Sequence, residues 1–150
     1  MVTDRTDGAT YNRVAGADTR LLLGGWQLLG QVASSFTSIG AGQAVSGKPL
    51  FELNAVKAGR ARGFTGVFEG VHPEFVAGSG FISRPGIVHA NATPRWSFYP
   101  KARRIEAISF SPIVDLTWEW DRFERGTEPN DIKFNSSTTA SWRGGWRTRL

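Results

Sequence analysis

Apolar and polar residues alternate most regularly in two neighbouring segments, 87–98 and 108–121. Every second residue of the first segment is apolar, beginning with Val88, and the residues between them are polar. The second segment repeats this alternation from Ile108 onward, with Ile113 as the exception. A period of two residues places alternate side chains on opposite faces of a β-strand. The pattern therefore predicts a hairpin of two antiparallel strands with one apolar face and one polar face.

The predicted strands are long, and aromatic residues gather at their ends. Strands in globular proteins typically contain about 5–6 residues. A strand of about 13 residues reaches roughly 43 Å at about 3.3 Å per residue, and when tilted by about 40–45° it crosses a hydrocarbon layer about 25–30 Å thick. Two interfacial girdles of a membrane barrel are therefore expected from the aromatic residues. They are Trp96, Phe98, Tyr99, Trp118, Trp120 and Trp142.

Weaker alternation elsewhere predicts about seven strands in one antiparallel up-and-down meander. They cover residues 11–23, 26–36, 49–60, 64–71, 87–98, 108–121 and the segment from 132. Short connections at 24–25, 59–63 and 100–104 alternate with longer ones at 37–48, 72–86 and 122–131, as in a barrel with tight periplasmic turns and longer outer loops. We expect residues 1–10 to form a polar lead and residues 11–150 to form a single all-β domain.

The composition agrees with β-structure and excludes several kinds of functional site. The chain contains 18 Gly, 6 Trp and no Cys, so disulfides, thiolate zinc sites and thiol nucleophiles are excluded. Residues 1–10 contain no apolar signal-peptide region, and no apolar run is long enough for a transmembrane helix. A barrel of the outer membrane needs an export signal and at least eight strands. We therefore expect this chain to be a segment of a longer exported protein.

The charge balance requires that nucleic acid be considered as a partner. Lys and Arg number 18 against 13 Asp and Glu, a net charge of +5. The basic residues gather at 60–62, at 101–104 and in the last ten residues. No recognition helix or RNA-binding signature accompanies them, and basic side chains at strand ends fit lipid phosphates equally well. We expect outer-membrane lipid as the partner rather than nucleic acid.

Polar residues on the alternating strands are expected to face an aqueous barrel interior. Asp115 and Glu119 would lie roughly 13 Å apart along one strand, too far for acid–base catalysis by paired carboxylates. Cross-strand partners for the carboxylates are expected among Arg95, Lys133 and Arg143. The predicted interior-facing residues are His89, Asn91, Arg95, Asp115, Glu119 and Asp121.

Catalytic and metal-binding constellations are missing from the sequence. His72 and His89 are the two imidazoles, and neither has a second ligand at a short spacing that would predict a metal site. No serine lies in a nucleophile elbow. We therefore expect no catalytic, cofactor-binding or metal-ligating residues, and no enzymatic activity.

Residues 71–86 carry a resemblance to a known family. The segment combines Pro-x-Phe, Gly-Phe followed by an aliphatic residue, and Arg two residues further on; the matching residues are Pro73, Phe75, Gly80, Phe81, Ile82 and Arg84. It resembles a connection between strands in uncharacterised bacterial outer-membrane β-barrel proteins that carry a family-nine-like carbohydrate-binding domain ahead of the barrel. Residues 12–18 and 30–31 are also similar to that family. The resemblance implies a barrel segment in the bacterial outer membrane, with carbohydrate binding confined to a domain upstream of Met1.

Two functions follow from the two directions that the apolar face can take. In the first, the chain is part of an outer-membrane β-barrel that has its apolar face in lipid and serves anchoring, passage or surface display. In the alternative, the chain forms a soluble lipocalin-like β-barrel whose apolar face points inward and binds a small hydrophobic ligand. The alternative requires no export signal, but it accounts less well for the length of the strands.

Overall fold

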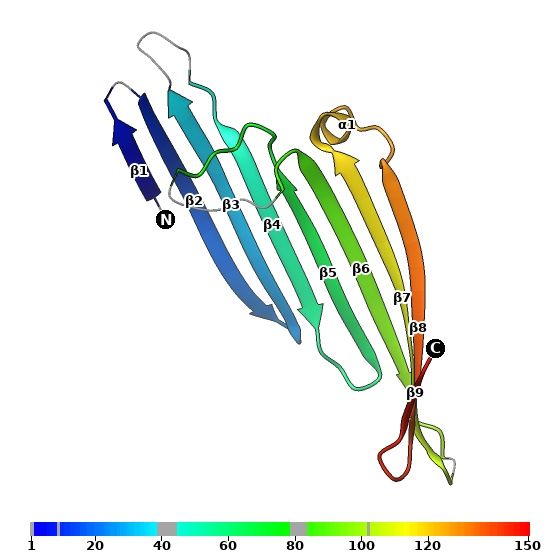
Figure 1. Ribbon diagram of the computed structural model, residues 1–150. Coiled ribbons are helices and arrows are strands. Elements are labelled where there is room, and N and C mark those ends of the chain that lie inside the picture. The colour runs from blue at the N-terminus through cyan, green and yellow to red at the C-terminus, as the bar shows by residue number, and fades with distance from the viewer. Residues whose placement is uncertain (1, 9, 39–44, 79–83, 102) are drawn as a thin grey trace.

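The computed structural model describes residues 2–8, 10–38, 45–78, 84–101 and 103–150. Nine antiparallel strands form one sheet in which each strand pairs with the next along the chain (Figure 1). They are β1 (Val2–Asp7), β2 (Thr10–Leu23), β3 (Trp26–Ser38), β4 (Lys48–Lys57), β5 (Arg62–Val71), β6 (Ile87–Phe98), β7 (Ile105–Glu119), β8 (Asp131–Trp142) and β9 (Arg147–Arg149). The predicted all-β, up-and-down meander is confirmed. The sheet is curved and open, with β1 and β9 at opposite edges.

The seven predicted long strands correspond to β2 to β8, and the two short edge strands, β1 and β9, were not predicted from the sequence. Residues 1–10 are not merely a polar lead, because Val2–Asp7 forms β1, in which Val2 lies opposite Ala15 of β2. At the other edge, β9 pairs with β8. Short edge strands with many polar residues lack an alternating apolar face. Backbone hydrogen bonds to a neighbouring strand hold them, and sequence periodicity does not report such bonds.

The second long strand begins three residues earlier and ends two residues earlier than predicted. β7 ends at Glu119, and the chain turns into a five-residue helix, α1 (Trp120–Glu124). The turn is held by two backbone N–H groups, since that of Glu119 donates to Asn130 Oδ1 at 2.8 Å and that of Trp120 donates to the Gly86 carbonyl at 2.9 Å. The prediction that Trp120 and Asp121 lie on the strand is therefore wrong. Within the described residues, no helix has the length and apolar character needed to cross a membrane.

The predicted hairpin turn at Gly24-Gly25 is confirmed. The two glycines have φ angles of +55° and +82°, and Leu23 lies directly opposite Trp26. A two-residue turn with positive φ at both positions matches the twist of the flanking strands, and glycine adopts these angles without steric cost.

The pairing register gives the sheet one apolar and one polar face, because residues directly opposite each other on neighbouring strands share a face. The apolar face carries Leu21, Leu23, Trp26, Leu28, Val32, Phe51, Leu53, Phe64, Phe68, Val88, Trp96, Phe98, Phe110, Val114, Leu116, Trp118, Ile132, Phe134 and Trp142. The polar face carries Asp18, Gln31, Glu52, Glu69, His89, Asn91, Asp115, Thr117 and Lys133. Exposed apolar exceptions on the polar face are Leu22, Leu29 and Val56.

Each face is covered by other parts of the chain near one end only. On the apolar face, the ring of Phe123 from α1 lies 6.3 Å from Phe51, 6.0 Å from Phe68 and 5.9 Å from Trp118, between ring centroids. On the polar face, residues 72–78 of the β5–β6 connection cross the strands (Figure 1), and Phe75 is buried there. The rest of the apolar face has no covering layer from the described chain.

Most of the apolar face is therefore open to its surroundings. Nine of its large side chains are 38–70% exposed: Leu21, Leu23, Val32, Leu53, Trp96, Phe98, Phe110, Ile132 and Phe134. The accessible surface of the molecule is 10374 Å², whereas a compact soluble monomer of 16.4 kDa exposes about 7,500 Å². This sheet does not bury its own apolar face.

A glycine-to-alanine comparison tests the packing beneath α1. Gly70 lies opposite Phe51, and a Cβ atom at Gly70 would lie 2.5 Å from Phe51 Cζ. Gly70→Ala must displace this ring, so we expect the free energy of unfolding to fall by about 1–3 kcal/mol. In the control Gly30→Ala, the nearest atom is the Thr19 methyl carbon at 3.3 Å, and the expected loss is below about 1 kcal/mol. Denaturant unfolding measures both; equal losses would contradict the predicted clash.

Candidate functional site

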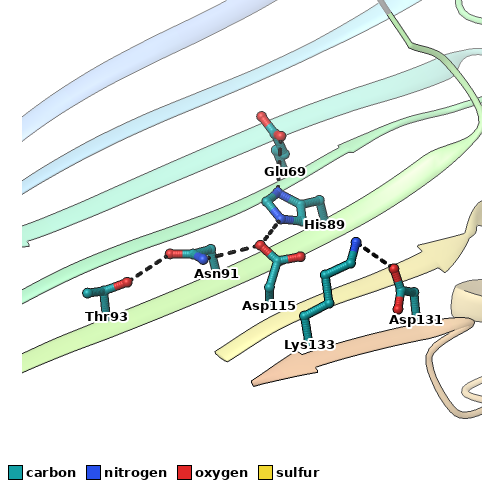
Figure 2. A network of polar contacts seen from close by, with 7 residues as sticks. All are labelled: Glu69, His89, Asn91, Thr93, Asp115, Asp131 and Lys133. Atoms are coloured by element: carbon teal, nitrogen blue, oxygen red, sulfur yellow. Dashed lines mark hydrogen bonds and ion pairs between the residues drawn. The ribbon is translucent and has the colours of Figure 1, made fainter. Parts of the chain in front are cut away.

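A continuous set of polar side chains crosses the polar face from β5 to β7 (Figure 2). His89 Nδ1 lies 3.3 Å from Glu69 Oε1, and His89 Nε2 lies 2.9 Å from Asp115 Oδ2. Asn91 Nδ2 donates to the same Asp115 oxygen at 3.2 Å, and Thr93 Oγ1 donates to Asn91 Oδ1 at 3.3 Å. We call these five residues the polar network.

Strand pairing brings the polar network together. His89, Asn91 and Thr93 are alternate residues of β6, so their side chains share a face. The β5–β6 register places Glu69 directly opposite His89, and the β6–β7 register places Asp115 directly opposite Asn91. One imidazole therefore lies between two carboxylates, one from each neighbouring strand.

The His89 ring is positioned to interact with both carboxylates. A neutral imidazole donates one N–H hydrogen bond, whereas the imidazolium form donates from both nitrogens. The imidazolium can therefore donate to Glu69 and Asp115 together, while a neutral ring can donate to one of them. The His89 and Asp115 side chains are 25% and 28% exposed, so solvent screens this contact less than a fully exposed ion pair.

A hollow of about 370 Å³ lies beside the polar network. Its lining includes Glu69, His89 and Asp115 together with two basic residues, Arg84 and Lys133. Carboxylates and cations in one open hollow can hold water or a small polar group that both donates and accepts hydrogen bonds. Among the described residues, no group of three or more His, Asp or Glu side chains is arranged to hold a metal ion.

The expected cross-strand cation partners differ from those observed. Lys133 lies opposite Asp115 in the register, but its Nζ atom is 2.7 Å from Asp131 Oδ2 (Figure 2). Arg95 donates instead to Ser97 Oγ and to the Gly59 carbonyl, each at 2.6 Å. Within the part of the chain that the structure describes, no ion pair joins Arg95, Lys133 or Arg143 to Asp115, Glu119 or Asp121, so the predicted cross-strand ion pairs are wrong.

Three of the six predicted interior-facing residues, His89, Asn91 and Asp115, come together. Glu119 lies at the end of β7, and Asp121 lies exposed in α1. Glu69 and Thr93 belong to the network but were not singled out from the sequence. Thr93 has the polar parity of its predicted strand, whereas the predicted strand of Glu69 has no cleanly polar face. The pairing register that brings Glu69 beside His89 could not be obtained from alternation.

The predicted aromatic residues separate into two groups at opposite ends of the strands. Trp96, Phe98 and Tyr99 lie at the end of β6, and Trp142 lies at the same end, where β8 finishes. Trp118 and Trp120 lie at the other end. Trp120 differs from the prediction because it is buried, with its ring centroid 6.0 Å from that of Phe51 and 5.3 Å from that of His72.

The β5–β6 connection, which contains the family-like motif, is fastened across the polar face. The backbone N–H of Val76 donates to Ser35 Oγ at 3.2 Å, and that of Gly78 donates to Asn12 Oδ1 at 2.8 Å. Arg5 Nη1 donates to the Gly78 carbonyl at 2.8 Å. Residues 72–78 therefore form a strap over β1, β2 and β3. Of the predicted motif residues, Pro73 and Phe75 lie in this strap, Arg84 lines the hollow, and Gly80, Phe81 and Ile82 are outside the described residues.

An ion pair adds a pH-dependent attachment to this strap. Lys48 Nζ lies 2.5 Å from Glu74 Oε2, and the hydrogen bond and positive charge of Lys48 hold the pKa of the Glu74 carboxyl below its usual range. A carboxyl whose pKa is lower in the folded state stabilises that state above its unfolded pKa. This contribution is lost as the pH falls through the folded pKa. Glu74 is exposed, so the effect is confined to a solvated contact.

Comparison of the chain with protein-family models, with curated proteins and with solved structures finds no match.

A double-mutant cycle tests the polar network. We expect His89→Gln and Asp115→Asn to be coupled by about 0.5–1.5 kcal/mol in the free energy of unfolding, because their half-buried side chains contact each other directly. The control cycle joins Lys133→Gln and Asp131→Asn, whose side chains are 60% and 50% exposed, and its coupling should be below about 0.5 kcal/mol. Denaturant titration of the single and double variants measures both. Absence of a difference between the cycles would contradict the assigned network.

Proposed function

We propose that this chain is part of a bacterial outer-membrane β-barrel whose apolar face contacts lipid and whose polar face contacts an aqueous interior. The observation that carries the proposal is an exposed apolar face on long strands. Strands β2 to β8 contain 10 to 15 residues. A strand of 15 residues such as β7 reaches about 50 Å, or about 35 Å along the membrane normal at a tilt of about 45°, enough for an apolar band about 25 Å tall.

The exposed apolar area supports lipid as the contacting medium. Contiguous apolar patches on soluble monomers seldom exceed a few hundred Å², whereas here nine large side chains stay exposed along one face of the sheet. Lipid hydrocarbon removes such side chains from water without a second protein layer. Alternation between a lipid-facing and an aqueous face is the expected pattern for strands of a membrane barrel.

The sheet has two open edges, and a membrane barrel requires further strands to pair with them. Within the described residues, β1 and β9 each pair on one side only. Backbone polar groups in lipid must be paired, which is why sheets cross membranes as closed barrels. We therefore infer that the remaining strands of a larger barrel complete this sheet. The lower ends of the strands also lie lower from β2 toward β6 in Figure 1, and a stagger between strands is needed for barrel closure.

The polar face then becomes part of the barrel wall that meets water. The polar network would bind water at this wall. The strap formed by residues 72–78 would narrow the barrel interior near one end. Anchoring, passage and surface display are the functions available to such a barrel, and the strap favours the functions that need no wide channel. The family resemblance adds the proposal that an attached domain binds carbohydrate.

Neighbouring single-cysteine variants test which face meets lipid. The chain contains no cysteine, so Val32→Cys and Gln31→Cys each introduce one unique thiol on opposite faces of β3. In reconstituted vesicles, we expect a fluorophore at position 32 to be quenched by lipid-attached quenchers. The matched thiol at position 31 should react with a water-soluble reagent.

The soluble alternative predicts a different result. A lipocalin-like barrel would remain a compact monomer without detergent, and a fluorophore at position 32 would be insensitive to lipid-attached quenchers while responding to a small hydrophobic ligand. That combination would exclude the membrane proposal.

A further inference from the structure

One end of the sheet collects most of the positive charge of the molecule. The connections β2–β3, β4–β5, β6–β7 and β8–β9 all lie at the lower end of the sheet in Figure 1. We call the segments that form it, residues 20–30, 54–65, 95–101, 103–108 and 139–150, the turn end. It contains eleven Lys and Arg residues and one acidic residue, Glu106. The basic residues are Arg20, Lys57, Arg60, Arg62, Arg95, Lys101, Arg103, Arg104, Arg143, Arg147 and Arg149.

The remainder of the chain has the opposite charge. It contains the other seven Lys and Arg residues and twelve Asp and Glu residues. The turn end therefore carries a net charge of +10, and the remainder carries −5, which together give the total of +5. The sequence shows three basic groups, but only the antiparallel topology places them at one end of a single sheet.

These positive charges are available to an external partner. Ten of the eleven basic side chains are exposed, and Arg95 is half-buried. Within the described residues, no ion pair joins any of the eleven to a carboxylate. Cations that lack internal counter-charges and face solvent create a positive potential that attracts an anionic surface.

Aromatic and apolar side chains lie directly beside the cations. The Arg60 guanidinium lies 4.5 Å from the centre of the Tyr99 ring, and Lys57 Nζ lies 5.2 Å from the centre of the Trp26 ring. Exposed Phe98 and Leu23 belong to the adjoining part of the apolar face. At the ends of β6 and β8 the aromatic residues Trp96, Tyr99 and Trp142 are followed by the cations Lys101, Arg103, Arg104 and Arg143. This order of apolar, aromatic and cationic residues matches the order of hydrocarbon, interface and phosphate across one leaflet of a bilayer.

We propose that the turn end binds the phosphate groups of anionic phospholipids at the membrane surface. This inference rests on the proposed lipid contact of the apolar face and adds a lipid class and an orientation to it. Single-stranded nucleic acid fits less well, because its binding sites track the backbone along a basic groove with stacking rings. Here the cations are spread over four turns and adjoin an apolar face.

Vesicle binding tests this assignment on the whole chain. We expect the protein to bind vesicles of phosphatidylcholine mixed with phosphatidylglycerol at least about tenfold more tightly than vesicles of phosphatidylcholine alone. The difference should shrink as salt is added, because salt screens exposed charges. The variant Arg103→Gln/Arg104→Gln should lose about threefold to tenfold in affinity for the anionic vesicles and keep its affinity for the neutral ones.

A second arginine pair supplies the matched control. Arg122→Gln/Arg125→Gln removes the same charge in and after α1, at the opposite end of the sheet, and should change the affinity for anionic vesicles by less than about twofold. Equal losses in the two variants would overturn the inference. So would tighter binding to a short single-stranded DNA than to the anionic vesicles.

The label at position 32 separates failure of this inference from failure of the proposed function. Lipid quenching of that label in phosphatidylcholine vesicles, without any preference for phosphatidylglycerol, would overturn the turn-end assignment and leave the membrane barrel intact. Absence of lipid quenching in both kinds of vesicle would overturn both.

Discussion

Both faces of this molecule depend on the register of antiparallel backbone pairing from β1 to β9. A slip of one residue between two strands would move every side chain of one strand to the opposite face of the sheet. The observed register keeps Val88 opposite both Gly70 and Trp118 on the apolar face, and keeps His89 opposite Glu69 on the polar face. The hydrogen bonds between strands and the side-chain contacts across them are therefore consistent with the same pairing register.

The same register produces a sheet whose stability depends on its surroundings. Within the described residues, the buried apolar side chains are Val14 of β2, Phe75 of the strap, Val88 of β6 and Trp120 of α1. Much of the remaining apolar face needs a contacting layer from outside the chain. Lipid on one side and water on the other would satisfy both faces, which is the physical basis of the proposed barrel.

The two ends of the sheet differ in charge. The turn end concentrates exposed cations next to aromatic rings, whereas the opposite end carries α1, the strap and most of the acidic residues. A sheet with this distribution would meet an anionic surface preferentially through its turns. Glu69, His89 and Asp115 of the polar network lie outside the turn end, so the contacts between them are separable from the proposed lipid binding.

Local alternation by itself determined the long strands β6 and β7, the two faces of the sheet and the Gly24-Gly25 turn, because a two-residue period and a two-glycine turn are properties of neighbouring residues. Edge strands β1 and β9 depend on backbone bonds to a neighbour, and α1 depends on ring packing of Phe123 against distant strands. The strap and the position of His89 between two carboxylates also join segments far apart in sequence. These features could not be predicted from local patterns, because the register between strands is a property of pairs of segments.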